Sequence, residues 1–341
     1  MHKRDIIVIG ASAGGVQALM ELIDALPEKL DAAVFIVLHI SPSTPSMLPH
    51  ILSRKGKFEA IHPKDGDTIK KGHVYIAPPD HHLILEKDTV LVRKGPKENR
   101  FRPSIDALFR SAAYTYSTRV IGIILSGMLD DGTSGLWTVK RLGGVSMIQD
   151  PHDARFPDMP KNALESVEVD YSVPIGEMGA IIERLITEKN ETNTMASEPE
   201  QERIQAEITI AVQDNAFEMG IMNMGPLTPF TCPECHGTLV AIEEGRIVRF
   251  RCHTGHGFTA SALLDGVTKV VEENLWAAVR GLEETVMLLE QTAGKLNAQG
   301  NSKDAKVFDK KAKETRNKSQ GIRKLIFEQE RMSEEKFESH E

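Results

Sequence analysis

The stretch from Ile6 to Gly15 constrains the fold of this chain more than any other. Four apolar residues at 6–9 predict a buried strand, glycines at 10, 14 and 15 permit a tight turn, and residues 16–23 have the apolar spacing of a helix. A strand that turns on glycines into a helix is typical of a parallel α/β sheet, and it puts Ser12 at the carboxyl end of that sheet. Backbone N–H groups at the start of such a helix can hold a phosphate or a developing oxyanion. The motif alone does not choose between a phosphate-binding turn and a nucleophilic serine.

Apolar strands alternate with amphipathic helices from the start of the chain to about residue 187. Further buried strands are predicted at 33–38, 120–125 and 145–148, and helices at 45–54, 134–142, 178–185 and from Ser104, as N-cap, to 109. This alternation predicts an α/β fold with a doubly wound, mostly parallel sheet. Hairpin-sized gaps separate three short apolar segments, which predict an antiparallel insertion of strands at 74–77, 83–85 and 90–92.

The composition changes after residue 187, and we therefore divide the chain there. Residues 1–187 form the α/β domain, and 188–225 are predicted to be a linker because their first half is polar, although 205–212 alternate like a strand. Apolar residues then recur three and four apart on both sides of a turn signal at 297–302, which predicts an antiparallel helical hairpin over 263–331. A small metal-binding module is predicted at 226–262, between linker and hairpin, and a polar tail at 332–341.

All three cysteines fall between Cys232 and Cys252, so they indicate a metal site. Cys232 and Cys235 form one pair, and Cys252 is followed directly by His253 and, three residues later, by His256. Two such pairs have the spacing of a tetrahedral Zn²⁺ site, and the segments 238–242 and 246–250 between them predict a hairpin. The sequence therefore predicts a zinc-ribbon-like module with a structural Zn²⁺. The alternative is a small core with free thiols.

Charge and composition exclude several partners. The formal net charge of −8 argues against binding to nucleic acid or to an anionic membrane surface. No apolar run approaches the length of a membrane span, so the chain is not expected to span a membrane. A cysteine set that reads as metal ligands points to a reducing compartment, and we expect a cytoplasmic protein.

Polar residues follow three of the predicted parallel strands. Ser12 follows the first strand, His39 the second, and Asp130 or Asp131 lies in the loop after the strand at 120–125. Alone, each has an ordinary explanation: a turn serine, a core histidine or a helix N-cap. Together they match what a serine nucleophile requires, a base to take its proton and a carboxylate to orient that base. The pattern therefore favours a hydrolase.

Over about residues 4–187 the sequence resembles the catalytic domain of the chemotaxis protein-glutamate methylesterases. The resemblance rests on His39 at the end of an apolar strand and on five motifs, at 9–15, 75–82, 99–106, 125–132 and 159–163. It implies a triad of Ser12, His39 and Asp131 that hydrolyses γ-glutamyl methyl esters to glutamate and methanol, and many members also deamidate glutamine. It implies no cofactor for catalysis. The implied partners are methylated chemoreceptor-type proteins and a glutamyl methyltransferase system.

The resemblance also directs the remaining site assignments. Oxyanion and pocket candidates are the backbone around Ala13 and Gly14, the backbone near Met128, and Arg102. Asp130 is then expected to cap the following helix or to face solvent. As fourth metal ligand we select His256 over His253, because the larger gap after Cys252 lets the chain turn back and because the resembling family usually keeps that position.

Three departures from the family pattern and two alternative functions remain open. The family's two-domain form begins with a receiver domain, whereas here the first strand starts at residue 5, so we expect control by a receiver to be absent from this chain. Ala13 stands where some relatives have threonine, and Phe101 where some have histidine. The alternatives are a nonenzymatic phosphate-binding protein and an adaptor with a vestigial esterase domain.

Overall fold

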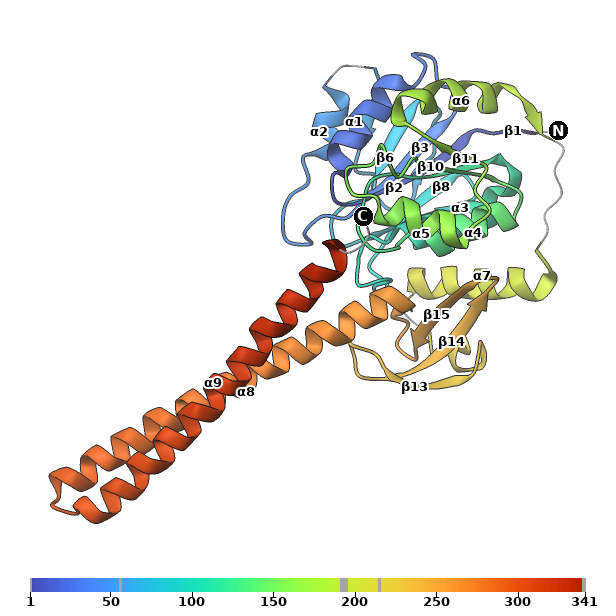
Figure 1. The fold of residues 1–341 in the computed structure, drawn as a ribbon. Helices are drawn as coiled ribbons and strands as arrows, with labels where there is room; N and C mark the ends of the chain where they lie inside the picture. The colour runs from blue at the N-terminus through green and yellow to red at the C-terminus, as the bar shows by residue number, and fades with distance from the viewer. Residues whose placement is uncertain (1, 55–56, 191–195, 214–215, 339–341) are drawn as a thin grey trace. The chain divides into compact units, whose positions relative to one another are not determined.

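The chain forms two compact units, Met1–Leu263 and Leu264–Glu341 (Figure 1). A computed structural model describes residues 2–54, 57–190, 196–213 and 216–338. The first unit contains a central sheet with its helices, a further helix and a small antiparallel sheet, and the second unit is helical.

The central sheet has seven strands, all parallel, in the order β11-β10-β9-β2-β3-β6-β4. Its strands are β2 (Ile6–Ala11), β3 (Ala33–Leu38), β4 (Glu59–Ile61), β6 (His73–Ile76), β9 (Val120–Ile124), β10 (Val145–Gln149) and β11 (Tyr171–Val173). From β2 the chain builds outward on one side through β3 and β6 and later on the other side through β9 and β10. Such a reversal opens a crevice at the carboxyl ends of the strands beside it, where ligands bind in open α/β sheets.

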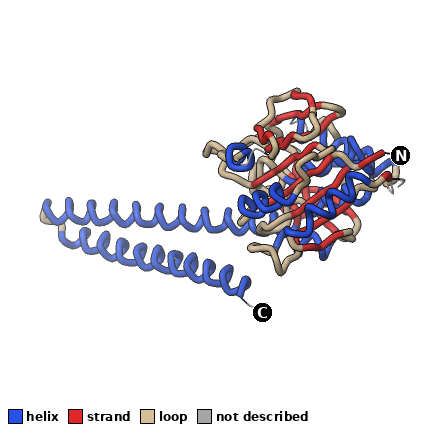
Figure 2. The backbone as a smooth tube through the Cα atoms, turned by 90° about the horizontal axis from the view of Figure 1, so that it is seen from above, coloured by secondary structure: helices blue, strands red, loops and turns tan. Residues whose placement is uncertain are grey.

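Helices cover both faces of the central sheet (Figures 1 and 2). One face packs against α1 (Gly15–Ala25), α2 (Leu48–Ser53) and α6 (Ile175–Thr187), and the other against α3 (Ile105–Tyr116), α4 (Thr133–Arg141) and α5 (Asp158–Ser166). Every residue of β2 and β3 is buried, which explains why both strands are continuous apolar runs. The predicted α/β architecture is confirmed.

The antiparallel insertion is present with three strands, but one of them is not the predicted segment. Strands β7 (His82–Glu86) and β8 (Thr89–Arg93) form a hairpin, and β5 (Asp67–Thr68) pairs with β8. The prediction is wrong for the segment at 74–77, because β6 pairs in parallel with β3 and β4 in the central sheet. A further antiparallel pair joins β1 (His2–Lys3) to β12 (Lys189–Asn190).

The segment expected to be a linker contains a helix that packs on the α/β fold. Residues Glu198–Gln213 form α7, so the strand expected at 205–212 is wrong. Ile204 and Ala211 are seven residues apart, so they lie on the same face of the helix, and both are buried. Helix α7 packs so closely on the α/β fold that a Cβ on Gly95 would overlap the backbone of Ala211. The alternation of Ile208, Ile210 and Val212 that suggested a strand is therefore overridden by tertiary packing.

A four-stranded antiparallel sheet follows α7, in the order β13-β14-β15-β16. Its strands are β13 (Leu227–Thr231), β14 (Thr238–Glu244), β15 (Ile247–Cys252) and β16 (Gly257–Thr259). The predicted hairpin is β14–β15, with Gly245 at φ +61° in its turn. We call residues 227–259 the ribbon module. Two short 3₁₀ turns, at 117–119 and 221–223, complete the first unit.

A buried ion cluster joins the ribbon module and α7 to the α/β fold. Arg249 of the ribbon module donates to Glu207 of α7 at 2.7 and 2.8 Å, and Arg251 donates to Glu207 at 2.7 Å. The guanidinium groups of Arg251 and Arg110 both lie against Glu98, at 3.0 and 3.1 Å. All five side chains are at least 97% buried. Breaking one partner in such a cluster leaves an unpaired buried charge, which costs about 3–5 kcal/mol.

This cluster should make the first unit sensitive to acid. Burial would raise the pKa of Glu98, but Arg110 and Arg251 outweigh it and lower that pKa from 4.5 to about 2, and the pKa of Glu207 is also well below 4.5. Groups with a lowered folded-state pKa stabilise the protein above their unfolded pKa. Stability should therefore fall as the pH drops from about 4.5 towards 2.

The measurement is the free energy of unfolding in urea at a series of pH values. Glu207→Gln removes one of the two titrating groups and should show a shallower decline below pH 4.5 than the unsubstituted chain. Glu243→Gln, on the exposed side of β14, is the matched control and should keep the full slope. An unchanged slope in Glu207→Gln would contradict the assignment.

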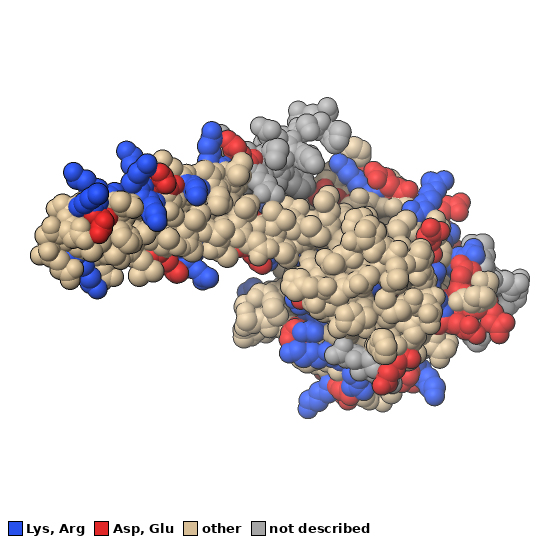
Figure 3. Space-filling view, turned by 90° about the horizontal axis from the view of Figure 1, so that it is seen from below, with Lys and Arg blue, Asp and Glu red and all other residues tan. Residues whose placement is uncertain are grey.

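The second unit is a pair of long helices. Helix α8 (Ala260–Ala298) starts in the first unit, and α9 (Ser302–Glu338) continues through most of the segment expected to be a polar tail, of which 339–341 lie outside the described residues. Buried positions recur every seven residues, as in a coiled coil; they are Val279, Val286 and Ala293 on α8 and Ala305, Ala312, Ser319 and Ile326 on α9. Lys and Arg side chains are spread along the outside of the hairpin (Figure 3). Among the described residues, no helix has the length and apolar character needed to cross a membrane.

Candidate active site

Three adjacent parallel strands bring Ser12, His39 and Asp131 together. Ser12 directly follows β2, His39 directly follows β3, and Asp131 lies in the loop after β9. Two backbone bonds tie these strand ends, from Ser12 N–H to Ser126 at 3.0 Å and from His39 N–H to Ala11 at 3.2 Å. The three side chains meet because the carboxyl ends of neighbouring parallel strands share one edge of the sheet.

A continuous chain of hydrogen bonds links the three side chains. The His39 ring has Nδ1 3.2 Å from Ser12 Oγ and Nε2 2.8 Å from Asp131 Oδ2. In the neutral ring that donates Nε2–H to the carboxylate, Nδ1 carries the lone pair and accepts the Ser12 hydroxyl. The ring is thus oriented to take a proton from Ser12, and the His39 and Asp131 side chains are only 4% and 1% exposed.

Asp131 is a buried carboxylate surrounded by donors. Its oxygens accept hydrogen bonds from His39 Nε2 (2.8 Å), Asn99 Nδ2 (2.8 Å), Ser104 Oγ (3.0 Å) and the backbone N–H groups of Ile105 (2.7 Å) and Asp106 (3.3 Å). Burial would raise the pKa of Asp131, but the hydrogen bonds, led by that from His39, lower it below 3.8. The lowered pKa favours the ionised form of Asp131, which accepts the hydrogen bond from His39.

The start of α3 is built around Asp131. Ser104 is the N-cap residue as predicted, but its hydroxyl does not cap α3 and instead donates to Asp131. The Asp131 carboxylate receives the first N–H groups of α3, at Ile105 and Asp106, so it serves as the cap from a distant segment. The motif at 99–106 therefore supports the triad carboxylate.

A second buried carboxylate, Asp106, lies beside Asp131. It accepts hydrogen bonds from the N–H groups of Gly132 at 3.1 Å and Gly135 at 2.6 Å, and from Asn99 Nδ2 at 2.8 Å. Burial and the charge of Asp131 raise the pKa of Asp106 to about 8. Of the two carboxyl groups, Asp131 therefore ionises more readily than Asp106. Sequence analysis missed Asn99 and Asp106 as site residues, although both lie in a motif on which the resemblance rests.

Asp130 neither caps the following helix with its side chain nor faces solvent freely, so that expectation is wrong. Its Oδ1 accepts the hydroxyl of Thr259, at 2.7 Å, and Thr259 belongs to the last strand of the ribbon module. Only its backbone carbonyl accepts from the following turn, at Thr133 N–H. The two adjacent aspartates therefore point to different partners, Asp131 to His39 and Asp130 to the ribbon module.

Backbone N–H groups border Ser12 on two sides. Those of Ala13, Gly14 and Met128 make no hydrogen bond within the described part of the chain. Gly14 is the N-cap residue of α1 and has φ +71°, a left-handed conformation that glycine adopts readily. Gly127 lies beside the serine, because a Cβ at this position would come within 2.9 Å of Ser12 Cβ. The two glycines thus leave Ser12 accessible beside free donors.

The predicted pocket residue Arg102 and its neighbour Phe101 have different partners. Arg102 donates to Asp80 at 2.7 and 2.9 Å and to the Gly95 carbonyl at 2.7 Å, so its guanidinium holds a loop and makes no hydrogen bond to the triad among the described residues. Phe101 stacks on the His39 ring, with centroids 3.7 Å apart and planes within 8°. The aromatic ring therefore limits the movement of the imidazole.

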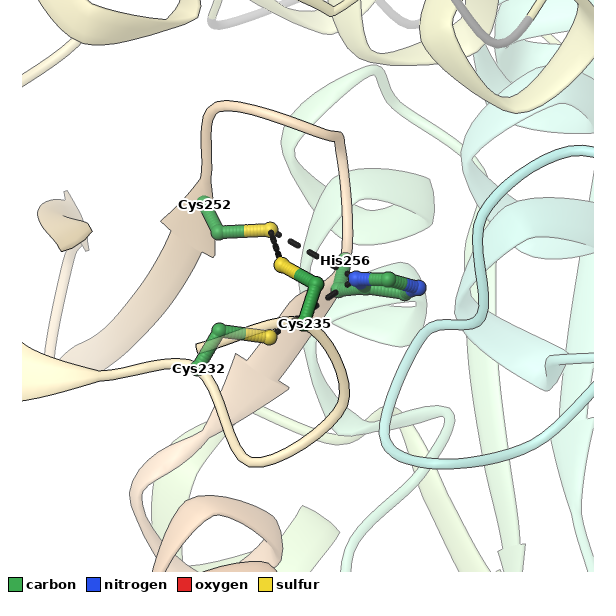
Figure 4. A group of neighbouring side chains, drawn as sticks. All are labelled: Cys232, Cys235, Cys252 and His256. Atoms are coloured by element: carbon green, nitrogen blue, oxygen red, sulfur yellow. Dashed lines mark hydrogen bonds between the residues drawn. The ribbon is translucent and has the colours of Figure 1, made fainter. Parts of the chain in front are cut away.

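The predicted metal ligands form a cluster in the ribbon module (Figure 4). One ligand atom from each of Cys232, Cys235, Cys252 and His256 lies within 4.8 Å of the others. The Cys235 and Cys252 sulfurs are 3.6 Å apart, and His256 Nδ1 lies 3.7 and 3.6 Å from the sulfurs of Cys232 and Cys252. A tetrahedral Zn²⁺ with Zn–S bonds of about 2.3 Å separates its ligand atoms by roughly 3.6–3.8 Å. The four residues therefore have the chemistry and spacing of a zinc site.

Comparison with known proteins identifies the α/β fold. The family model described as CheB methylesterase matches residues 7–182, more than half of the chain. This chain belongs to the CheB methylesterase family. A CheB relative of Leptospira interrogans is 37% identical over 182 residues, which are 53% of this chain and 94% of the relative.

Further CheB relatives agree with this assignment. A protein-glutamate methylesterase/protein-glutamine glutaminase of Methanosarcina mazei is 35% identical over 191 residues, 54% of this chain and 52% of its own length. The crystal structure of the Thermotoga maritima CheB methylesterase catalytic domain superposes with a TM-score of 0.51 at 33% identity, covering 55% of this chain and all of that domain. The ribbon module and the helical hairpin lie outside the CheB match.

Proposed function

We propose that this chain is a serine hydrolase that removes methyl groups from γ-glutamyl methyl esters of chemoreceptor-type proteins and releases methanol. The observation that carries the proposal is the hydrogen-bonded series Ser12–His39–Asp131 at the carboxyl ends of adjacent strands. Membership of the CheB family supplies the substrate class, and a methyltransferase that forms the same esters is the expected counterpart. The names of its relatives add protein-glutamine deamidation as a second reaction of the same site.

In the first half of the reaction Ser12 becomes acylated. Ser12 Oγ attacks the ester carbonyl carbon while its proton passes to His39 Nδ1, 3.2 Å away. The N–H groups of Ala13, Gly14 and Met128 are the candidates to stabilise the oxyanion of the tetrahedral intermediate. His39 then protonates the departing methoxide oxygen, so that methanol leaves and a glutamyl ester of Ser12 remains. The charge of Asp131 stabilises the imidazolium in both steps.

In the second half of the reaction water hydrolyses the acyl-enzyme. His39 takes a proton from the water, the resulting hydroxide attacks the same carbonyl carbon, and the proton returns to Ser12 Oγ as glutamate is released. Deamidation of glutamine follows the same sequence with ammonia as the leaving group. No group outside the chain and water is needed for proton balance in either reaction.

The phosphate-binding alternative has less support. The N–H groups at the start of α1 are suited to a phosphate, but a phosphate-binding turn has no use for a serine bonded to a buried imidazole and carboxylate. The adaptor alternative likewise gives no reason for the five donors around Asp131. The hydrolase proposal accounts for all of these contacts.

Methanol release tests the proposal. The purified full chain should release methanol from a methylated chemoreceptor and ammonia from a receptor with glutamine at the same sites. Prior treatment with a fluorophosphonate should block both reactions and label Ser12. A chain that binds the receptor but neither releases methanol nor reacts with the fluorophosphonate would support the adaptor alternative.

We also propose that Cys232, Cys235, Cys252 and His256 bind a structural Zn²⁺ in a zinc-ribbon arrangement. The support is the spacing of the four ligand atoms and the absence of an acidic group or open position in the set. Thiolate ligands persist in reducing compartments, so the proposal carries a cytoplasmic location with it. The metal would hold together the two loops at the ends of β13–β14 and β15–β16, where the apolar core is small.

Metal content should follow these four residues. The purified chain should contain one zinc, and His256→Ala should lose it and lower the thermal stability of the ribbon module, because structural sites contribute folding energy. His253→Ala is the matched control, since its exposed side chain lies outside the cluster, and it should retain the metal. Zinc content by atomic emission decides the assignment, and loss of zinc in His253→Ala alone would reverse it.

A further inference from the structure

The last strand of the ribbon module pairs with the loop that carries Asn99. Gly257 of β16 donates its N–H to Lys97 at 3.1 Å and accepts the Asn99 N–H at 2.8 Å. Glu98 and Gly257 therefore form an isolated parallel bridge at the edge of the ribbon sheet. Because the segment 97–99 belongs to the esterase fold, the two parts of the first unit share a backbone hydrogen-bonded edge.

The Asn99 side chain bridges the ribbon module and the triad. Its Oδ1 accepts the N–H of Thr259 at 2.9 Å, and its Nδ2 donates to Asp131 at 2.8 Å and to Asp106 at 2.8 Å. Asn99 is only 3% exposed. The opposite amide orientation would face its NH₂ group towards an N–H and its oxygen towards two carboxyl groups, so the orientation is determined. With its φ of +51°, Asn99 is also held in a backbone conformation that asparagine tolerates better than most residues.

Thr259 makes a second link to the same loop of the esterase. Its hydroxyl donates to Asp130 at 2.7 Å, while its N–H donates to Asn99. Thr259 thus binds both Asp130, the residue before Asp131, and Asn99, which donates a hydrogen bond to Asp131. Asp130, Asp131 and Asn99 can keep their relative positions only while β16 stays in register.

The loop that leads into β16 carries two of the proposed metal ligands, Cys252 and His256. His256 immediately precedes Gly257, and its carbonyl accepts the N–H of Cys252 at 3.0 Å. In the same loop, Arg251 donates to the Gly255 carbonyl at 2.8 Å and lies 3.0 Å from Glu98, the residue before Asn99. A metal bound by Cys252 and His256 would therefore hold the loop from which β16 starts.

We propose that the ribbon module positions the triad carboxylate through Thr259 and Asn99, and that metal binding at Cys232, Cys235, Cys252 and His256 thereby raises esterase activity. Asn99 is a positioning residue, because it touches Asp131 and none of the reacting atoms. This inference rests on the proposed hydrolase function and on the proposed metal site.

The first test compares substitutions in the full chain, with kcat, KM and the pH dependence of kcat/KM as readouts. Asn99→Ala removes a donor that favours ionised Asp131, so kcat should fall at least about tenfold with KM within about twofold, and the acid limb should move to higher pH. Thr259→Val should shift both quantities in the same direction by less. Thr238→Val, at an exposed position of the same module, is the control and should match the unsubstituted chain. An unchanged acid limb and kcat in folded Asn99→Ala would overturn the positioning role.

The second test needs no substitution and does not depend on whether Asn99→Ala folds. Zinc is removed from the full chain with a chelator and then restored. We expect the rate of Ser12 labelling by a fluorophosphonate to fall at least about tenfold and to recover with zinc, and amide hydrogen exchange in 97–106 to increase while that of β2 and β3 stays unchanged. Equal labelling rates and equal exchange with and without zinc, or a chain that binds no zinc, would overturn the metal coupling.

These outcomes separate the inference from the proposed function. If the zinc-loaded chain does not react with the fluorophosphonate at all, the hydrolase proposal fails and the coupling fails with it. If it reacts and releases methanol at rates that are indifferent to zinc and to Asn99→Ala, only the coupling is wrong.

Discussion

Replacing Ser12 with alanine should reduce methanol release from a methylated receptor by several orders of magnitude without disturbing the fold. Ser12 lies after the end of β2, and its side chain makes one hydrogen bond, to His39. Removal of the hydroxyl therefore leaves no buried donor or acceptor without a partner except the imidazole, which still bonds to Asp131. The nucleophile is lost while packing is kept.

The measurement combines methanol release with the midpoint of thermal unfolding. The midpoint of Ser12→Ala should lie within a few degrees of the unsubstituted chain, and fluorophosphonate labelling should disappear. Ser43→Ala is the matched control, because Ser43 is exposed in the loop after His39 and its hydroxyl bonds to that of Ser41. Full turnover by a folded Ser12→Ala variant would exclude the triad mechanism.

Asp131→Asn should lower turnover about 10³- to 10⁴-fold, because the neutral amide favours the wrong tautomer of His39. Every group around the Asp131 carboxylate is a donor, on both of its oxygens. An asparagine must direct its NH₂ group at some of these donors in either orientation. The substitution therefore also disturbs the start of α3, and its effect on kcat should be larger than that on KM.

Asp130→Asn is the matched comparison at the adjacent residue. Its amide oxygen can still accept the hydroxyl of Thr259, so turnover should fall at most about tenfold. Both variants are measured on the same methylated receptor, with zinc content checked to exclude loss of the ribbon module. A larger loss for Asp130→Asn than for Asp131→Asn would reverse the assignment of the triad carboxylate.

Local sequence patterns were sufficient to predict the α/β architecture and that Ser12, His39 and the loop with Asp130 and Asp131 lie at one edge of the sheet. Continuous apolar runs at β2, β3 and β9 predict strands buried on both faces, and glycines at 14 and 15 predict the turn into α1. Parallel strands then force Ser12, His39 and the aspartate loop to one edge of the sheet. The spacing of the cysteines and His256 likewise constrains one cluster, because each ligand pair is short and the hairpin between the pairs returns the chain.

Local sequence patterns gave wrong predictions for segments whose apolar spacing is compatible with two different secondary structures or pairings. The apolar residues of 205–212 suit a strand or a helix, and the contact of Glu207 with Arg249 and Arg251 decides for α7. The strand β6 has the length of a hairpin strand, but it pairs in parallel with β3 and β4 in the central sheet. Neither contact is encoded in the periodicity of its own segment.

Long-range contacts decided the surroundings of the triad. The sequence determined which residues stand at the strand ends, because strand, turn and helix signals act over fewer than about ten residues. The hydrogen bonds of Ser104 and Asn99 to Asp131, and that of Thr259 to Asp130, depend on tertiary structure. Asn99 and Thr259 are 160 residues apart in the chain, and Asp130 and Thr259 are 129 apart. Buried polar groups need hydrogen-bond partners. Which groups become buried together is decided when the ribbon module packs on the esterase fold, so these pairs cannot be predicted from local sequence.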